Sequence, residues 1–412
     1  MTHTGTEAAA GTEEPGRAGG AEAADGTNEP HGAGGAEAAA GPGEPEGVAA
    51  TGPRPDGSAQ PEGTDVAGPR SDVTAPAEKA ASAGPRPGGT AQPGATAIGA
   101  GPVDAAGPAV DPLTPRARRL CDAMSAAFPG PGDAAALRLA TTPRDGRRVR
   151  EVGFVRDGSA GGVPVRVYSA DRSPGAPTGP LVVFAHGGGW VMCDPDTHDG
   201  LCRELAARAG ATVVSVDYRR APEHRFPAAA DDLYAAVVWA YERWGRPVVV
   251  AGDSSGGNLA ASAALRARDE QRPYICGQLL IYPVLDHRLA GASATEFADG
   301  FFHTAAHMRW YWEQYLGPDG DPSVPYASPG LAPDLSGLPP ALVVLADCDP
   351  LRDEGLAYAR GLARTGTPAQ VHLSPGMFHG FLGGIGILPE AEAALETASR
   401  WLRDGGPPPT AT

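Results

Sequence analysis

A serine in the middle of the chain stands in a pattern that can make it a nucleophile. The only Gly-x-Ser-x-Gly in the sequence is GDSSG at 252–256, and it directly follows an apolar run, VVVAG. The next residues, GGNLAASAALRA, have a helical composition. A glycine-flanked turn between a strand and a helix projects a serine hydroxyl at the carboxyl end of a sheet. We therefore predict that Ser254 is the nucleophile, with Ser255 as its rival.

Three consecutive glycines follow another apolar run, LVVFA, in the sequence HGGGW at 186–190. Glycines placed after a strand present bare backbone N–H groups, which can hold the negative oxygen of a tetrahedral intermediate. We expect this oxyanion hole to use the amides of Gly187 and Gly188, with the amide of Ser255 as a third donor. His186 is interpreted as a structural residue rather than a base.

A serine nucleophile needs a general base, and the base needs a carboxylate that orients it. Two late apolar runs end in such residues: ALVVLA is followed by DCDPLRD, and AQVHLS by PGMFHGF. The carboxyl ends of strands are where an open sheet places its ligands. We predict His379 as the base and Asp349 as its partner, in preference to Asp347 and Asp353. Asp353 is explained more simply as a charge at a helix start.

The elements that would position these residues alternate between strand and helix. Short apolar runs predict buried strands at 163–169, 181–185, 212–216, 248–252, 277–283, 341–346 and 369–374. Helical stretches are predicted at 115–128, 199–209, 228–244, 256–268, 351–365 and 389–404. Runs that are apolar on both faces are typical of a mostly parallel sheet with helices on both sides, an α/β fold. The aromatic-rich stretch 286–335 interrupts this rhythm and is interpreted as an inserted lid.

The first 112 of the 412 residues have a different composition from the rest. They contain 23 Gly and 15 Pro but no Leu, Phe, Tyr, Trp or Cys, and they carry most of the net charge of −16. Such a segment cannot bury enough apolar surface to offset its chain entropy. We predict a disordered low-complexity tail over 1–112, a folded domain over 113–404 and a short disordered end over 405–412.

Composition excludes several classes of function. The only lysine is Lys79, inside the tail, so the predicted domain has no lysine for a phosphate-binding loop, a Schiff base or a Ser-Lys dyad. The sequence contains no apolar run of membrane-spanning length, and its first residues have neither a basic start nor an apolar core, so we expect neither a transmembrane helix nor a secretory signal. An acidic chain without a basic stripe is also a poor candidate for nucleic-acid binding.

Cysteines and histidines give no sign of a metal or a disulfide framework. The five cysteines are odd in number and never in Cys-x-x-Cys spacing, which favours reduced thiols and a cytoplasmic location. His303 and His307 have helical spacing but lack the glutamate of a His-Glu-x-x-His motif and a third ligand. We expect no metal and no organic cofactor.

Together the motifs resemble the hormone-sensitive-lipase family of esterases, which have the α/β-hydrolase fold. The matching pieces occur in the family's order over roughly 113–404: HGGGW, DYRRAPEHRFPAA, GDSSGGNLAA, YPVLD, DPLRDEG and FHGF. The resemblance implies Ser254, His379 and Asp349 as a catalytic triad, with a helical cap built from about 113–145 and 286–335. Two residues depart from the family pattern, because Ser255 is more commonly Ala and Arg220 more commonly Leu.

The expected function is that of a serine carboxylesterase acting on short-chain acyl esters. A deacetylase or amidase that acts on a particular metabolite would use the same machinery, and the sequence does not separate the two. A non-catalytic small-molecule receptor on this fold is the alternative from another class, which the presence of His379 disfavours. The chain is expected to act as a monomer or as a homodimer, in which the edge strand AQVHLS could pair with another subunit.

Overall fold

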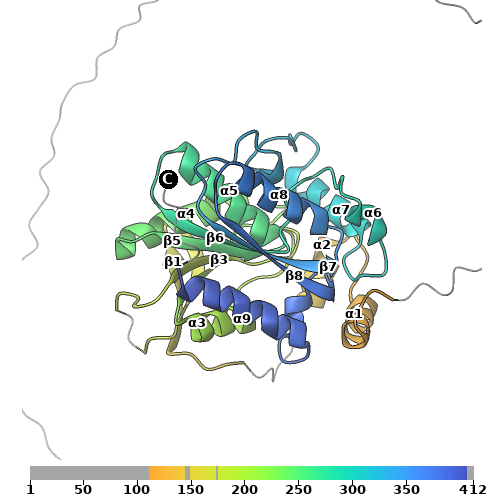
Figure 1. Cartoon of the computed structure of the whole chain (residues 1–412), viewed down its shortest axis with the longest axis horizontal. Helices are drawn as coiled ribbons and strands as arrows, with labels where there is room; N and C mark the ends of the chain where they lie inside the picture. The colour runs from red at the N-terminus through yellow and green to blue at the C-terminus, as the bar shows by residue number, and fades with distance from the viewer. Residues whose placement is uncertain (1–110, 144–148, 173–174, 406–412) are drawn as a thin grey trace, which may run out of the picture. The chain divides into compact units, whose positions relative to one another are not determined.

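The computed structural model describes residues 111–143, 149–172 and 175–405. The predicted tail, apart from its last two residues, and residues 406–412 lie outside this part of the chain. Within it, one sheet carries helices on both faces (Figure 1). The predicted α/β fold with a mostly parallel sheet is confirmed.

The sheet has eight strands in the order β1-β2-β4-β3-β5-β6-β7-β8. Strands β3 to β8 run parallel, and only the pairs β1–β2 and β2–β4 are antiparallel. The last strand is at one edge, as predicted for AQVHLS. The bounds are β1 Phe154–Ala160, β2 Val163–Ser169, β3 Leu181–Ala185, β4 Thr212–Val216, β5 Val248–Asp253, β6 Ile275–Ile281, β7 Ala341–Cys348 and β8 Ala369–Phe378.

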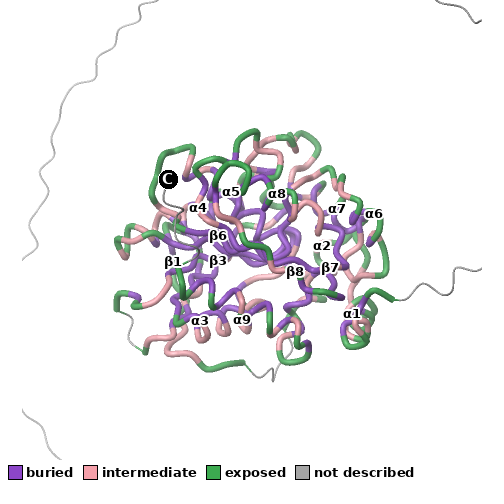
Figure 2. The backbone as a smooth tube through the Cα atoms, in the orientation of Figure 1, coloured by how far each residue is buried: buried purple, intermediate pink, exposed green. Residues whose placement is uncertain are grey.

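Helices cover the two faces of the sheet and enclose two separate hydrophobic cores (Figure 1). On one face, α3 (Asp199–Ala209) packs beside α9 (Pro389–Arg403). The other face is covered by α4 (Ala228–Trp244), α5 (Ser255–Asp269) and α8 (Arg352–Arg364). The central strands β3, β4 and β5 are buried along their whole length (Figure 2). A rigid sheet therefore carries the loops at its carboxyl end.

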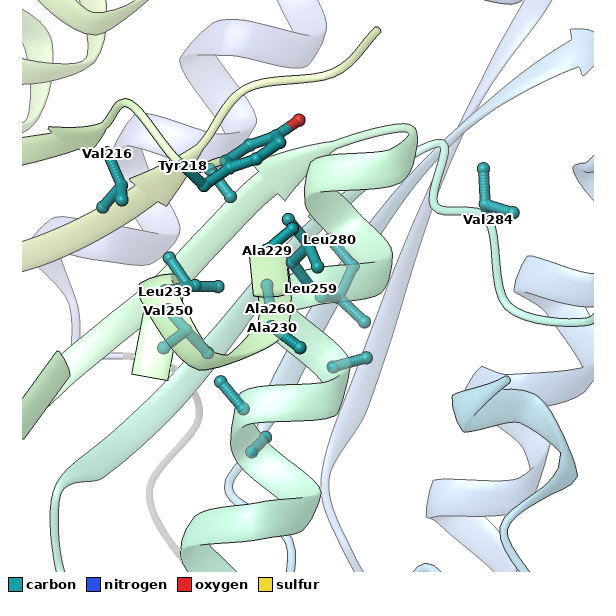
Figure 3. Packing of buried hydrophobic residues seen from close by; sticks show 14 of the residues in the cluster. Val216, Tyr218, Ala229, Ala230, Leu233, Val250, Leu259, Ala260, Leu280 and Val284 are labelled. Carbon is teal, nitrogen blue, oxygen red and sulfur yellow. The ribbon is translucent and has the colours of Figure 1, made fainter. Parts of the chain in front are cut away.

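Helix α5 is buried on all sides, and its composition explains how. Every residue from Ser255 to Leu265 is buried, and most of them are Ala, Gly or Ser. Small side chains let the helix approach β5 and α4 closely, as Leu259 and Ala260 do beside Val250 and Leu233 (Figure 3). The residue immediately before α5 is thus fixed by the core of the domain.

The two segments predicted as a cap hold short helices at one end of the sheet (Figure 1). Thr304 caps the N-terminus of α7, and the ring of His307 bonds back to the capping residue, which fixes where α7 begins. No helix among the described residues is long and apolar enough to cross a membrane. The remaining bounds are α1 Pro115–Ala127, α2 Ala134–Thr141, α6 Ser293–Glu296, α7 Ala305–Leu316, and the 3₁₀ turns η1 Pro329–Leu331 and η2 Phe381–Gly384.

Candidate active site

Ser254 lies at a sharp turn between β5 and α5, as the sequence predicted. Its backbone has φ 54° and ψ −118°, a conformation that costs a non-glycine residue about 1–3 kcal/mol. The turn fits only because its neighbours lack side chains: a Cβ on Gly252 would lie 2.3 Å from Gly256, and one on Gly256 would lie 2.0 Å from Ala185. The strained turn presents Ser254 to a cavity between the sheet and the cap segments.

His379 and Asp349 meet Ser254 from two neighbouring strands. Asp349 directly follows β7 and His379 directly follows β8. The Nε2 atom of His379 is 2.9 Å from Ser254 Oγ, and its Nδ1 atom is 2.8 Å from Asp349 Oδ2. The other carboxylate oxygen of Asp349 accepts the N–H of Leu351 at 2.8 Å. All three side chains are buried, so water competes little for these hydrogen bonds.

The cavity in front of Ser254 has a volume of about 580 Å³. Its polar lining includes Ser254, His379 and the glycine loop and, from the cap, His303 and Tyr311, while many of the other lining residues are apolar. Both cap segments contribute to it. The apolar lining comprises Met124, Phe128, Met192, Leu201, Phe302, Met308, Leu382, Ile385 and Ile387. A cavity of this size and character is suited to a small, largely apolar molecule.

The glycine loop differs from our expectation at Gly187. The N–H of Gly187 donates to the carboxylate of Asp253 at 2.8 Å, so it is not free to hold a substrate oxygen. Gly188 and Gly189 line the cavity instead, both with positive φ. Their amides and that of Ser255 have no acceptor within the described part of the chain. The N–H of Gly187, which we predicted as a donor to the oxyanion, thus already has an acceptor in the structure.

The hydroxyl of Ser255 ties the nucleophile turn to the glycine loop. It accepts the backbone N–H of Trp190 at 3.1 Å, and its side chain is fully buried. An alanine at this position would lack that bond. Ser255 therefore helps to hold the loop, although its hydroxyl does not face the cavity as a second nucleophile would.

The buried Asp253 and the partly buried His198 form a pair that sequence reasoning missed. The Nε2 atom of His198 is 3.1 Å from Asp253 Oδ1, the same oxygen that accepts the N–H of Gly187. Burial alone would raise the pKa of Asp253, but the charge and hydrogen bond of His198 and the Gly187 amide lower it below its ordinary value. The signal was available in the sequence, since Asp253 is part of GDSSG.

His186 is enclosed beneath the glycine loop. Its ring stacks on Tyr218 with centroids 4.2 Å apart, and its Nδ1 atom is 2.8 Å from the carbonyl oxygen of Gly187. Burial, with a smaller contribution from His198, lowers the pKa of His186 to about 3. It therefore stays neutral and structural at neutral pH.

Because the pKa of His186 is lowered in the folded protein, we expect the folding stability to depend on pH. Unfolded His186 would titrate near pH 6.5, so below that pH the unfolded chain binds the extra proton and stability falls until about pH 3. Between about pH 7.5 and about pH 5, wild type should lose about 2 kcal/mol more than His186→Gln. Urea unfolding at both pH values measures this difference, which is independent of any constant cost of the substitution.

His372→Gln, at a half-buried histidine on the edge strand β8, is the matched control. Burial lowers the pKa of His372 as well, but the neighbouring charge that acts on His186 is lacking there, so the control should change the pH slope less. An unchanged slope in His186→Gln would contradict the prediction.

Residues 182–383 match a family model described as the alpha/beta hydrolase fold. The chain is 42% identical over 283 residues to the esterase LipI of Mycobacterium tuberculosis, an alignment that covers 66% of this chain and 86% of LipI. It is 37% identical over 249 residues to an ethyl acetate hydrolase of Pseudomonas putida, covering 58% and 77%. A solved esterase from Pyrobaculum calidifontis superimposes with a TM-score of 0.64 at 37% identity, covering 71% of this chain and 98% of that one.

Proposed function

We propose that this chain, a carboxylic-ester hydrolase of the hormone-sensitive-lipase family of α/β hydrolases, cleaves short-chain acyl esters. The proposed nucleophile is Ser254. The observation that carries the proposal is the continuous hydrogen-bonded series Asp349–His379–Ser254 at the wall of an apolar cavity. Each member has the partner and the distance that its role in acyl transfer needs.

In the proposed reaction, Ser254 Oγ attacks the ester carbonyl while His379 Nε2 takes its proton. Asp349 accepts the Nδ1–H of His379, keeps the correct tautomer and stabilises the imidazolium. The tetrahedral intermediate then collapses, and His379 gives the proton to the departing alcohol. Water, deprotonated by His379, attacks the acyl-enzyme, and the acid leaves as Ser254 regains its proton.

The amides of Gly188, Gly189 and Ser255 are proposed to hold the negative oxygen of both intermediates. All three amides lack an acceptor within the described residues, and the first two residues line the cavity. Ser255 is also the first residue of α5, so the positive end of the helix dipole favours charge there. Gly187 is not part of this set.

The acyl preference is tested with p-nitrophenyl esters from acetyl to dodecanoyl. The Pseudomonas putida relative is an ethyl acetate hydrolase, which supports a short acyl group. We expect kcat/KM to be highest for the short esters and to fall toward dodecanoyl. A maximum at dodecanoyl would contradict the short-chain assignment. Faster cleavage of the matching p-nitroanilide would favour the amidase alternative.

The identity of the nucleophile is tested by covalent trapping. A p-nitrophenyl alkylphosphonate should phosphonylate the enzyme once and release one nitrophenol, because phosphonates imitate the tetrahedral intermediate. Peptide mass spectrometry should place the adduct on Ser254. An adduct on Ser255, or none on a protein that is folded, would overturn the proposed role of Ser254.

Asp253 is proposed as a positioning residue for the glycine loop. In Asp253→Asn the side chain can still accept the Gly187 N–H, but it loses the charge that pairs with His198. We expect kcat to fall about tenfold with KM nearly unchanged, less than the roughly 10²–10³ lost with a direct oxyanion donor. Steady-state kinetics with p-nitrophenyl acetate measure the split between kcat and KM.

Asp217→Asn is the matched control, because this half-buried carboxylate faces a neighbouring groove rather than the cavity of Ser254. It should leave kcat close to that of wild type. If Asp253→Asn changed KM alone, the positioning role would be wrong.

A further inference from the structure

Two polar side chains of the cap line the cavity and have no role in the reaction described above. His303 directly precedes Thr304, the residue that caps α7, and Tyr311 lies about two turns further along that helix. Both line the same cavity as Ser254 and His379. Because Thr304 fixes where α7 begins, it also helps to fix the positions of His303 and Tyr311 beside Ser254 and His379.

The pair packs against both halves of the proposed catalytic machinery. The ring of Tyr311 covers Gly189, where a Cβ atom would lie only 2.4 Å from the ring. The ring of His303 stands edge-on to the ring of His379, with centroids 5.3 Å apart and an interplanar angle of 89°. The pair thus lies beside the glycine loop and beside the base at once.

His303 and Tyr311 bond to each other and are both uncharged. The Tyr311 hydroxyl oxygen is 3.4 Å from His303 Nδ1. Burial, with the positive charges that His379 and His307 would carry, holds the pKa of His303 well below its usual value. Burial likewise raises the pKa of Tyr311 well above 10. At neutral pH the pair is therefore a phenol beside a neutral imidazole.

A phenol and a neutral imidazole that share one hydrogen bond always have one donor hydrogen left. If Tyr311 donates to Nδ1, the free hydrogen is on Nε2 of His303; if Nδ1 donates, it is the phenol hydrogen. His303 Nε2 has no other partner in the described part of the chain, and it is not among the polar atoms sealed off from solvent there. When the hydrogen is on Nε2, the free donor is therefore at an atom open to the cavity that His303 lines.

The place of this donor indicates which part of a substrate it meets. His379 must hand its proton to the leaving alcohol, so the alcohol part of the ester lies next to the His379 ring. His303 packs on that same ring, and much of the surrounding wall is apolar, since the rings of Phe128 and Phe302 pack against His303 and against each other. Because the pair is neutral, it suits an uncharged acceptor oxygen and not a carboxylate.

We propose that His303 and Tyr311 form a polar subsite for the alcohol part of the substrate, which selects esters whose alcohol carries a second, uncharged oxygen close to the ester bond. An ether or hydroxyl oxygen in that position accepts the free hydrogen of the pair. A hydrocarbon of the same shape leaves this hydrogen unpaired in an apolar wall. The subsite rests on the proposed function, since it concerns the specificity of the same reaction.

The test compares 2-methoxyethyl butyrate with butyl butyrate, which have nearly the same shape and differ by one oxygen in the alcohol. The measured quantity is kcat/KM for 2-methoxyethyl butyrate divided by kcat/KM for butyl butyrate. The two esters differ in chemical reactivity by the same factor for every enzyme form, so a change in this ratio between wild type and a variant comes from the enzyme. We expect His303→Phe to lower this ratio about three- to tenfold, the worth of one neutral hydrogen bond. Tyr311→Phe, which removes the partner that orients His303, should lower it by less.

His307→Phe is the matched control, because the same replacement is made four residues further on at a histidine that does not line the cavity. It removes the bond from the ring of His307 to Thr304 at the N-terminus of α7, but it should leave the ratio as in wild type. A ratio that falls equally in His307→Phe would show a general disturbance of the cap and would overturn the subsite.

Two further outcomes decide the proposal. An unchanged ratio in His303→Phe would overturn it, as would a change seen only on the acyl side, with ethyl methoxyacetate against ethyl butyrate. If wild type hydrolyses both alcohol-side esters and the ratio is the same in His303→Phe, the subsite is wrong while the esterase function stands. If wild type hydrolyses none of the four esters, the proposed function fails and the subsite with it.

Discussion

Replacement of Ser254 by alanine is expected to lower kcat for p-nitrophenyl acetate by about 10⁶. The nucleophile is removed, and nothing at the same place can replace it, because His379 Nε2 then has no hydroxyl to deprotonate. Alanine keeps the same backbone preferences, so the strained φ of 54° is neither relieved nor worsened and the turn should remain. Stopped-flow or long-time hydrolysis assays, with the unfolding midpoint measured beside them, check both expectations.

Ser255→Ala is the matched control for this prediction. It removes the neighbouring hydroxyl and its bond from Trp190 N–H but leaves the amide that is proposed to hold the oxyanion. We expect a loss of about tenfold or less in kcat, consistent with one neutral hydrogen bond. Activity that survives in Ser254→Ala and disappears in Ser255→Ala would exchange the two roles and overturn the proposed mechanism.

The buried strands and the motifs at their ends were predictable because their patterns are local. The runs VPVRVYS, LVVFA and TVVSV coincide with β2, β3 and β4 to the residue. Strands that are buried on both faces, such as β3 and β4, are mostly apolar, so they stand out from the more polar or glycine-rich segments that flank them. The chemistry-bearing residues stand at these ends, and the structure brings Ser254, His379 and Asp349 within hydrogen-bond distance of one another.

Strand β1 was missed because its sequence is polar. FVRDGSA lies at the edge of the sheet with its middle residues exposed, so it lacks the apolar run by which the others were recognised. A signal was nevertheless present: Gly161 and Gly162 both have positive φ and join β1 to β2 in a two-residue hairpin. A Gly-Gly pair between two segments of strand length predicts such a turn.

The roles within the glycine loop could not be predicted from spacing alone. HGGGW offers three similar amides, and the choice among them depends on which one a distant side chain already occupies. That side chain is Asp253, 66 residues further along the chain, and its bond to Gly187 exists only once β3 and β5 are adjacent. The proposed subsite of His303 and Tyr311 was unpredictable for the same reason. Both residues belong to a cap segment, and the periodicity of the sequence does not show how that segment packs.

An asparagine at 349 is expected to lower kcat by about 10⁴, the second largest effect. Asp349 Oδ1 already accepts the N–H of Leu351, so the amide oxygen of the asparagine should keep that place. Its NH₂ group then faces His379 Nδ1 and can only donate, which forces the imidazole hydrogen onto Nε2. That tautomer donates to Ser254 Oγ and cannot take its proton. The measurement is kcat with p-nitrophenyl acetate at neutral pH.

Asp347→Asn and Asp353→Asn are the matched controls, because both carboxylates lie within four residues of Asp349 and neither contacts His379. Asp353 accepts the backbone N–H of Ser293 at 3.0 Å, and Asp347 lies 3.8 Å from Arg352 at the surface. Both variants should keep kcat within about tenfold of wild type, since each loses at most a surface ion pair or one hydrogen bond. If either lost as much activity as Asp349→Asn, the carboxylate partner of His379 would be misassigned. If Asp349→Asn alone loses its activity, the loss comes from the hydrogen bond and charge that Asp349 supplies to His379, because the two controls each remove a nearby carboxylate without touching that ring.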